Sequence, residues 1–215
     1  MSKIYLEILD ANRKRAYKQL GRFSSHGYLA GGTALALQLG HRTSIDFDIF
    51  VSRKIGRTLR RHTREVFGEV KYHIDAGGDQ ISFEIDHAVQ VTFLWYYYPL
   101  LYPVIATRSL PLASIRDIAA DKAHAIGRRV VWRDYIDIFW LLRHDHMTLG
   151  QIIEDAKKKF KGEFNEILFL EQLTYFEGLI IEPVEYRKKA YKTAEIMDFF
   201  KTHVARYRNT LLREH

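Results

Sequence analysis

The sequence predicts an α/β (α+β) protein, in which a small mixed sheet with helices against it is followed by a helical C-terminal part. Apolar and polar residues alternate over 45–51 and over three later runs, which is the period of strand side chains. From residue 113 onward, apolar residues recur at helical spacing instead. Hydrophobic residues make up 47% of the 215 positions, enough for a substantial core.

The N-terminal part, residues 1–112, is expected to hold the sheet and its flanking helices. A helix is predicted over 4–20, and Gly21 ends it. Ala76–Asp79 is a favourable hairpin connection, and Asp86-His87 marks a tighter turn. These signals separate strands predicted at 28–30, 45–51, 69–75, 80–86 and 88–97.

The C-terminal part, residues 113–215, is expected to be helical. The helix that begins at Arg133 is apolar on all sides in its later half, so we expect it to be buried. The basic runs 157–161 and 187–189 are typical of solvated faces. The predicted helices span 114–127, the segment from Arg133, 149–160, 165–176 and 193–212.

Composition narrows the functional classes. The absence of cysteine excludes a disulfide framework, a cysteine metal site and a cysteine nucleophile, and it fits a reducing cytoplasm. The N-terminus has no long apolar region typical of a signal peptide, and no apolar run is long enough to span a bilayer. A net charge of +7 and a pI near 9.5 point to a polyanionic partner.

Two carboxylates, Asp46 and Asp48, lie two residues apart on a predicted strand. Side chains alternate along a strand, so both carboxylates should face one side while Ile45 and Phe47 face the other. Adjacent carboxylates repel one another unless a cation lies between them. A hard cation such as Mg²⁺ accepts carboxylate oxygens together with substrate phosphates.

Gly31-Gly32-Thr33 precedes this strand and opens a short helical run. The first turn of a helix presents backbone N–H groups and the positive end of the helix dipole, which suit a phosphate group. Gly-Gly before a helix is also common as a simple turn. Combined with Asp46 and Asp48, the segment predicts a site for a metal ion and a triphosphate.

At these residues the chain resembles a known family. Gly31-Gly32-Thr33, then Gly40–Ser44, then Asp46-x-Asp48 resembles the polymerase-β-like nucleotidyltransferase superfamily, and more closely the AbiEii/AbiGii toxin branch of type IV toxin–antitoxin systems. The resemblance covers roughly the first two-thirds of the chain. It implies transfer of a nucleoside monophosphate from an NTP to an acceptor hydroxyl, with the 3′ end of a tRNA as acceptor and a cognate antitoxin as partner.

The resemblance also implies roles for individual residues. Asp46 and Asp48 would hold Mg²⁺ or Mn²⁺, and Gly31-Gly32-Thr33 would bind the phosphate tail with Ser44 nearby. Lys122 lies on the apolar side of a predicted helix, where it either extends its ammonium to solvent or neutralises phosphates. Asp117 to Lys122 matches the family's Asp-x-x-x-x-Lys pattern.

Arg133-Asp134-x-x-Asp137 resembles the fourth motif of the AbiEii family. By that resemblance Asp134 would orient Lys122 or act as a base. Capping of the helix by Asp134 is the simpler alternative. Arg133 and Asp137, four residues apart, are expected to form a salt bridge.

The superfamily normally has a third carboxylate on a neighbouring strand, and here Thr92 stands where it is expected. Glu84 and Asp86 are alternatives on the adjacent strand, although solvent-facing strand positions are the favoured explanation for both. With two protein carboxylates, one Mg²⁺ remains compatible with the sequence, while a two-metal mechanism is in doubt. Thr92 therefore leaves open a catalytically inactive nucleotide- or RNA-binding module.

Arg57, Arg60, Arg61 and Arg64 share one face of a predicted helix directly after the acidic strand. They form either a solvated face or a surface for RNA phosphates. The aromatic run Trp95–Pro103 either packs in the core and continues into a Pro-bounded loop, or stacks on a base, and the first is favoured. His144 and His146 are expected in a surface turn rather than a zinc site.

Overall fold

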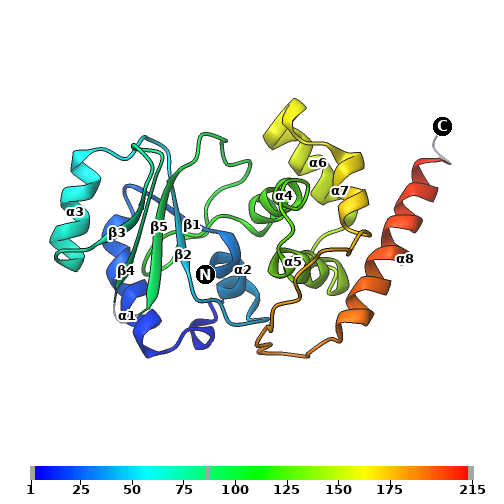
Figure 1. The fold of residues 1–215 in the computed structure, drawn as a ribbon, viewed down its shortest axis with the longest axis horizontal. Coiled ribbons are helices and arrows are strands. Elements are labelled where there is room, and N and C mark those ends of the chain that lie inside the picture. The colour runs from blue at the N-terminus through cyan, green and yellow to red at the C-terminus, as the bar shows by residue number, and fades with distance from the viewer. Residues whose placement is uncertain (1–2, 86–87, 213–215) are drawn as a thin grey trace. The chain divides into compact units, whose positions relative to one another are not determined.

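The computed structural model describes residues 3–85 and 88–212. The chain forms two compact units, 1–114 and 115–215, named here the sheet unit and the helical unit (Figure 1). None of the helices in the described ranges has the length and hydropathy needed to cross a membrane.

The sheet unit contains a five-stranded mixed sheet in the order β1-β2-β5-β4-β3. Only the β2–β5 pair is parallel, and the other neighbouring strands are antiparallel. The strands are β1 (Gly27–Ala30), β2 (Phe47–Val51), β3 (Tyr72–Asp75), β4 (Gln80–Ile85) and β5 (Val89–Trp95). The helices of this unit are α1 (Ala11–Leu20), α2 (Gly31–Leu39) and α3 (Arg57–Phe67).

One face of the sheet forms the core of this unit. Phe47, Phe83 and Phe93 point to that face and are fully buried. Tyr17 of α1 stacks on Phe47 at 6.2 Å between ring centroids, and Phe67 of α3 lies 5.9 Å from Phe83. Both helices therefore cover the same face, as Figure 1 shows. The opposite face carries half-buried polar and aromatic side chains.

The N-terminal helix is shorter than predicted. It begins at Ala11, because the side chain of Asp10 accepts a hydrogen bond of 2.8 Å from the backbone N–H of Arg13 and so caps α1. A short 3-10 helix over Leu6–Ile8 replaces the predicted first turns. The expectation for Ile45 was also wrong: it precedes β2 and is 45% exposed instead of facing the core.

The hairpin between β3 and β4 is confirmed. The N–H of Asp79 donates to the carbonyl of Ala76 at 2.9 Å, and Gly77 and Gly78 adopt positive φ. β3 begins at Tyr72 rather than at 69. The turn predicted at Asp86-His87 lies outside the described residues.

The helical unit contains α4 (Ile115–Ile126), α5 (Trp132–Arg143), α6 (Leu149–Phe160), α7 (Glu166–Gln172) and α8 (Thr193–Leu211). The later half of α5 is buried as predicted, with Ile138, Phe139 and Leu141 inaccessible to solvent. Asn165 caps α7, which ends at Gln172, earlier than predicted.

Ion pairs join α4 to α6. Lys159 on α6 lies 2.7 Å from Asp121 and 3.3 Å from Asp117, and its side chain is fully buried. Arg116 makes a bidentate contact with the buried carboxylate of Asp155 at 2.7 and 2.9 Å. The prediction that 157–161 forms a solvated face was therefore wrong for Lys159, because this position of α6 faces α4 rather than water.

Candidate active site

Asp48 lies on the half-buried face of the sheet, on strand β2 between β1 and β5. In the strand register it lies opposite Ala30 of β1 and opposite Thr92 of β5. Its neighbours Phe47 and Ile49 are fully buried, whereas Asp48 is half-buried, so the alternation predicted for this strand holds. Asp46, immediately before β2, is also half-buried.

Gly31 brings the start of α2 against Asp48. Its φ of +64° is in the left-handed region, and a Cβ at this position would lie 2.8 Å from Oδ2 of Asp48. No other residue type satisfies both constraints without strain. The N-cap residue Ala30 provides no side-chain acceptor, so it does not cap the first backbone N–H groups of α2.

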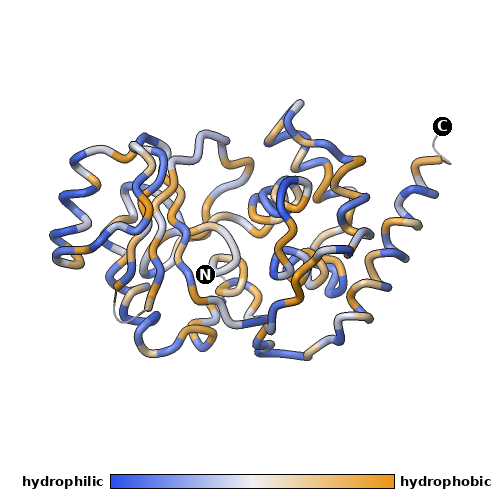
Figure 2. Tube along the Cα trace, viewed as in Figure 1, coloured by the Kyte–Doolittle hydropathy of each residue, from blue (hydrophilic) through white to orange (hydrophobic). Residues whose placement is uncertain are grey.

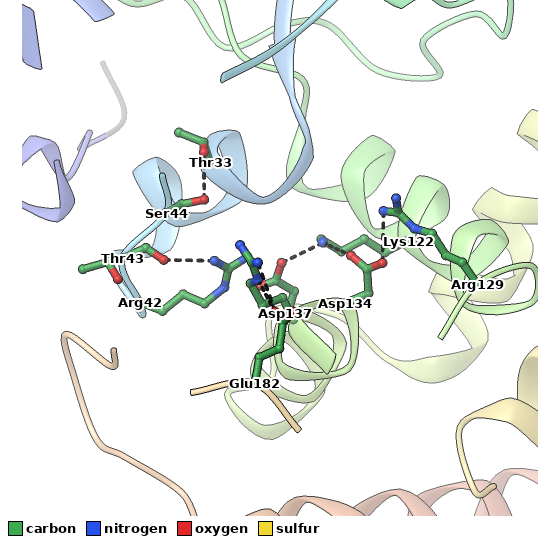
Figure 3. A network of polar contacts seen from close by, with 10 residues as sticks. Thr33, Arg42, Thr43, Ser44, Lys122, Arg129, Asp134, Asp137 and Glu182 are labelled. Carbon is green, nitrogen blue, oxygen red and sulfur yellow. Dashed lines mark hydrogen bonds and ion pairs between the residues drawn. The ribbon is translucent and has the colours of Figure 1, made fainter. Parts of the chain in front are cut away.

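Thr33 and Ser44 form a buried hydroxyl pair (Figure 3). Oγ1 of Thr33 lies 2.8 Å from Oγ of Ser44 and also bonds to the carbonyl oxygen of Asp46. A hydroxyl donates one hydrogen bond, so Thr33 donates to Asp46 and accepts from Ser44. The two side chains thus connect α2 to the segment before β2. Their contact with a nucleotide stays a prediction.

The position opposite Asp48 on the neighbouring strand carries hydroxyl groups. Oγ1 of Thr92 lies 2.9 Å from Oγ of Ser82, which also accepts a hydrogen bond of 3.1 Å from Nε2 of Gln80. Glu84, one of the alternatives to Thr92, accepts a hydrogen bond of 2.9 Å from the backbone N–H of Ala88. The other alternative, Asp86, lies outside the described residues.

Lys122 of the helical unit lies between two carboxylates of α5 (Figure 3). Its Nζ is 2.6 Å from Oδ1 of Asp134 and 2.7 Å from Oδ2 of Asp137. Lys122 is 6% exposed and Asp137 is fully buried. Arg129 approaches the other oxygen of Asp134 at 3.2 Å. The prediction that Asp134 orients Lys122 agrees with this contact, while a catalytic role for either residue stays a prediction.

Asp137 was missed as a partner of Lys122. The expected salt bridge between Arg133 and Asp137 was wrong, because Arg133 pairs with Glu182, at 3.0 Å from Nη2 to Oε2. Glu182 belongs to the loop before α8, which sequence spacing does not reveal. The available signal was the spacing of Asp134 and Asp137, since residues three apart share a helix face.

The four arginines of α3 differ in their contacts and in their exposure to solvent. Arg60 donates two hydrogen bonds to Asp75, at 2.6 and 2.7 Å, and its guanidinium lies over the ring of Tyr72. Hydrogen bonding from Arg60 lowers the pKa of Asp75. The other three, Arg57, Arg61 and Arg64, are exposed, and Figure 2 shows that α3 is mostly hydrophilic.

The residues that could hold a metal ion are few. Within 3–85 and 88–212, no group of three or more His, Cys, Asp or Glu side chains is arranged to hold a metal ion. His144 was expected in a surface turn rather than in a zinc site, and its Nε2 forms a hydrogen bond of 3.1 Å with Oη of Tyr191. Asp46 and Asp48 therefore remain the candidate ligands, as a pair of carboxylates.

Comparison with solved structures supports the predicted fold. A putative nucleotidyltransferase from Helicobacter pylori matches 96% of this chain and 99% of its own, with a TM-score of 0.60 and 16% identity. MenT4, a nucleotidyltransferase toxin from Mycobacterium tuberculosis H37Rv, matches 90% of this chain and 82% of its own, with a TM-score of 0.61 and 14% identity. The fold is thus that of polymerase-β-like nucleotidyltransferases, as predicted.

Sequence comparison carries the assignment further. An uncharacterized protein from Aquifex aeolicus is 32% identical over 190 residues, which cover 84% of this chain and 87% of that relative. The family model described as nucleotidyl transferase AbiEii toxin, type IV TA system, matches residues 18–212. The chain therefore belongs to the AbiEii family of nucleotidyltransferase toxins.

Proposed function

We propose that the protein transfers a nucleoside monophosphate from an NTP to a hydroxyl of RNA, with the 3′ end of a tRNA as acceptor and pyrophosphate as the leaving group. The family provides the reaction class. One observation carries the assignment to residues: the start of α2 closes on Asp48 so tightly that only glycine fits at position 31. A phosphate-binding helix start and a carboxylate pair are thereby adjacent.

The phosphate tail is assigned to the first turn of α2. Backbone N–H groups of Gly31, Gly32 and Thr33 have no partner within the first turn of the helix, and the N-cap residue Ala30 does not cap them. The hydroxyls of Thr33 and Ser44 act indirectly, by holding this turn next to Asp46. Such fixed donors stabilise developing charge without reorganising during the reaction.

Asp46 and Asp48 are assigned to a divalent cation. Their oxygens are the donor type that Mg²⁺ and Mn²⁺ prefer, and two carboxylates leave positions for phosphate oxygens and water. When bound, the ion would supply neutralisation of charge on the phosphate oxygens. The residues present therefore fit one cation, and their number does not favour two.

Lys122 is assigned to the negative charge of the departing pyrophosphate. Asp134 and Asp137 hold its ammonium at 2.6 and 2.7 Å, which restricts the side chain to one orientation. Transfer is then mainly electrostatic positioning of an in-line displacement.

The direct test is incubation of the purified protein with Mg²⁺, total tRNA and each α-labelled NTP in turn. We expect label in RNA with the native chain and a loss of about a hundredfold or more with Asp48→Asn. Asp79→Asn, an exposed carboxylate of the same unit, serves as the matched control. Transfer that survives in Asp48→Asn would refute the assignment.

A second candidate is a catalytically inactive nucleotide- or RNA-binding module. The pairing of Thr92 with Asp48 in the strand register, where a third carboxylate is expected, favours it. This alternative predicts salt-dependent RNA binding without product. Label in RNA excludes it, whereas binding without label supports it, and gain of transfer in Thr92→Asp would identify the reason.

The toxin role and the antitoxin partner are tested in cells. Expression should arrest growth, and Asp48→Asn should not. Co-expression of the cognate antitoxin should relieve the arrest, and arrest that persists would count against the pairing.

Arg57, Arg61 and Arg64 are proposed to contact RNA phosphates. Replacing all three by Gln should therefore lower the slope of log affinity against log salt concentration.

A further inference from the structure

Aromatic side chains adjoin Asp48 on the same face of the sheet. Phe50 follows Asp48 by two residues on β2, so strand alternation places both on the half-buried face. Tyr28 lies opposite Phe50 in the register of β1 and β2, with 6.0 Å between ring centroids. The face that carries the carboxylate thus continues into aromatic rings.

The rings continue beyond β5 as one connected set. Phe50 is 4.3 Å from Tyr96, Tyr96 is 5.4 Å from Tyr98, and Tyr98 is 4.2 Å from Tyr97. The N–H of Tyr96 donates to the carbonyl of Val51 at 3.0 Å, which holds this segment beside the end of β2. We name Phe50, Tyr96, Tyr97 and Tyr98 the aromatic row.

The aromatic row is not part of the core of the sheet unit. Tyr97 is 61% exposed, and Phe50, Tyr96 and Tyr98 are half-buried. By contrast, Phe47 and Phe93 on the opposite face are fully buried. Core packing with a Pro-bounded loop was favoured for Trp95–Pro103 from sequence; Tyr97 follows the end of β5, and core packing does not account for it. Large exposed aromatic rings in a connected set indicate a binding surface.

The aromatic row and Gly31 lie toward opposite ends of β2 from Asp48, and this placement indicates which substrate the row would contact. β1 and β2 are antiparallel, so Gly31 lies toward the start of β2, whereas Tyr28 lies toward its end beside Phe50. In an in-line displacement, the attacking and leaving oxygens lie on opposite sides of the phosphorus. The proposed function assigns the phosphate tail to Gly31, so pyrophosphate would leave on that side and the acceptor would approach from the side of Phe50.

We propose that the aromatic row stacks the unpaired 3′-terminal bases of the acceptor RNA and so presents the terminal hydroxyl to the reaction. This inference rests on the proposed function. Several rings in succession suit consecutive bases of a single strand better than the one base of an NTP. Stacking on aromatic side chains tolerates any base and is a common mode of single-strand recognition.

The test uses binding without NTP or metal ion, so it does not depend on catalysis. The probe is a hairpin RNA with a short unpaired 3′ tail that ends in 2-aminopurine, whose fluorescence is quenched by stacking. We expect quenching and binding with the native chain. Tyr97→Ala should weaken binding about tenfold and remove the quenching, and Tyr97→Phe should restore both. Tyr175→Ala, an exposed tyrosine of the helical unit, is the matched control.

Three outcomes would overturn the inference. These are equal affinity for the tailed hairpin and a blunt one, unchanged quenching in Tyr97→Ala, or a rise in KM for the NTP without a rise in KM for RNA. The last would assign the row to the base of the NTP. Any of these outcomes, together with transfer to RNA, rejects the inference and keeps the proposed function. Stacking without any transfer rejects the proposed function instead.

Discussion

The two units of the chain differ in how deeply they bury the charged side chains of the candidate site and of the ion pairs. In the sheet unit, Asp46 and Asp48 are half-buried, and the face of Asp48 also carries the half-buried ring of Phe50. In the helical unit, Lys122 and Lys159 are buried, each between two carboxylates. Strand alternation keeps one face accessible, whereas packed helices enclose the polar groups that they bring together.

Because of this difference, substitutions of charged residues in the two units must be measured differently, by stability in the helical unit and by activity in the sheet unit. Removing a buried cation leaves uncompensated carboxylates, so its first effect is on folding. Removing a half-buried carboxylate relieves repulsion and affects folding little, so its first effect is on activity. Loss of transfer in a Lys122 variant is therefore informative only when its stability is measured as well.

The largest effect on stability is expected for Lys122→Met. Asp134 and Asp137 then lose their shared ammonium while they remain buried, which costs about 3–5 kcal/mol in the free energy of unfolding. Denaturant titration measures it. Arg60→Met removes a partly exposed ion pair in the sheet unit and should cost less. Similar losses in the two variants would contradict the contrast between the units.

A smaller effect is expected for Gly31→Ala. The added Cβ would lie 2.8 Å from Oδ2 of Asp48 and would force a residue with a side chain to φ +64°, at a cost of about 1–3 kcal/mol. Gly162→Ala, where a Cβ meets nothing within 4 Å, is the control. Transfer should fall in Gly31→Ala even where the chain is folded. Native stability together with full transfer would show that the close approach of α2 to Asp48 is dispensable.

The smallest effect is expected from pH. Burial lowers the pKa of five histidines below the ordinary value of 6.5, and all but His26 belong to the helical unit: His26, His124, His144, His146 and His203. Between the lowered pKa and 6.5 the unfolded chain binds protons that the folded chain does not, so stability falls as pH falls through this window.

Thermal melting followed by tryptophan fluorescence measures this loss, since Trp140 stacks on His144 at 4.2 Å between ring centroids. His203→Phe keeps a ring against Phe199 but removes a titrating group, and it should reduce the pH dependence below about 6.5. A melting temperature that does not fall on acidification through this range would contradict the burial of these rings.

Local patterns were sufficient for most of the sheet unit. The alternation around Asp48, the start of α2 at Gly31 and the turn at Ala76–Asp79 all follow from a few neighbouring residues, and each appears in the structure. The shorter α1 follows from the cap formed by Asp10, a local signal that the apolar spacing of the first residues obscured. The N-cap at Asp10, which can be recognised in the sequence, therefore sets the start of α1 more reliably than the spacing of apolar residues.

Helix starts, turns and strand alternation depend on adjacent residues, so the elements, the face of each motif residue and the family could be predicted from the sequence. The partners of the charged groups could not, because they depend on how distant segments pack. Asp137 pairs with Lys122 and not with Arg133, and Lys159 is buried against α4. The physical reason is that the partner of a charge depends on which distant segment removes its water, and sequence spacing does not contain that information.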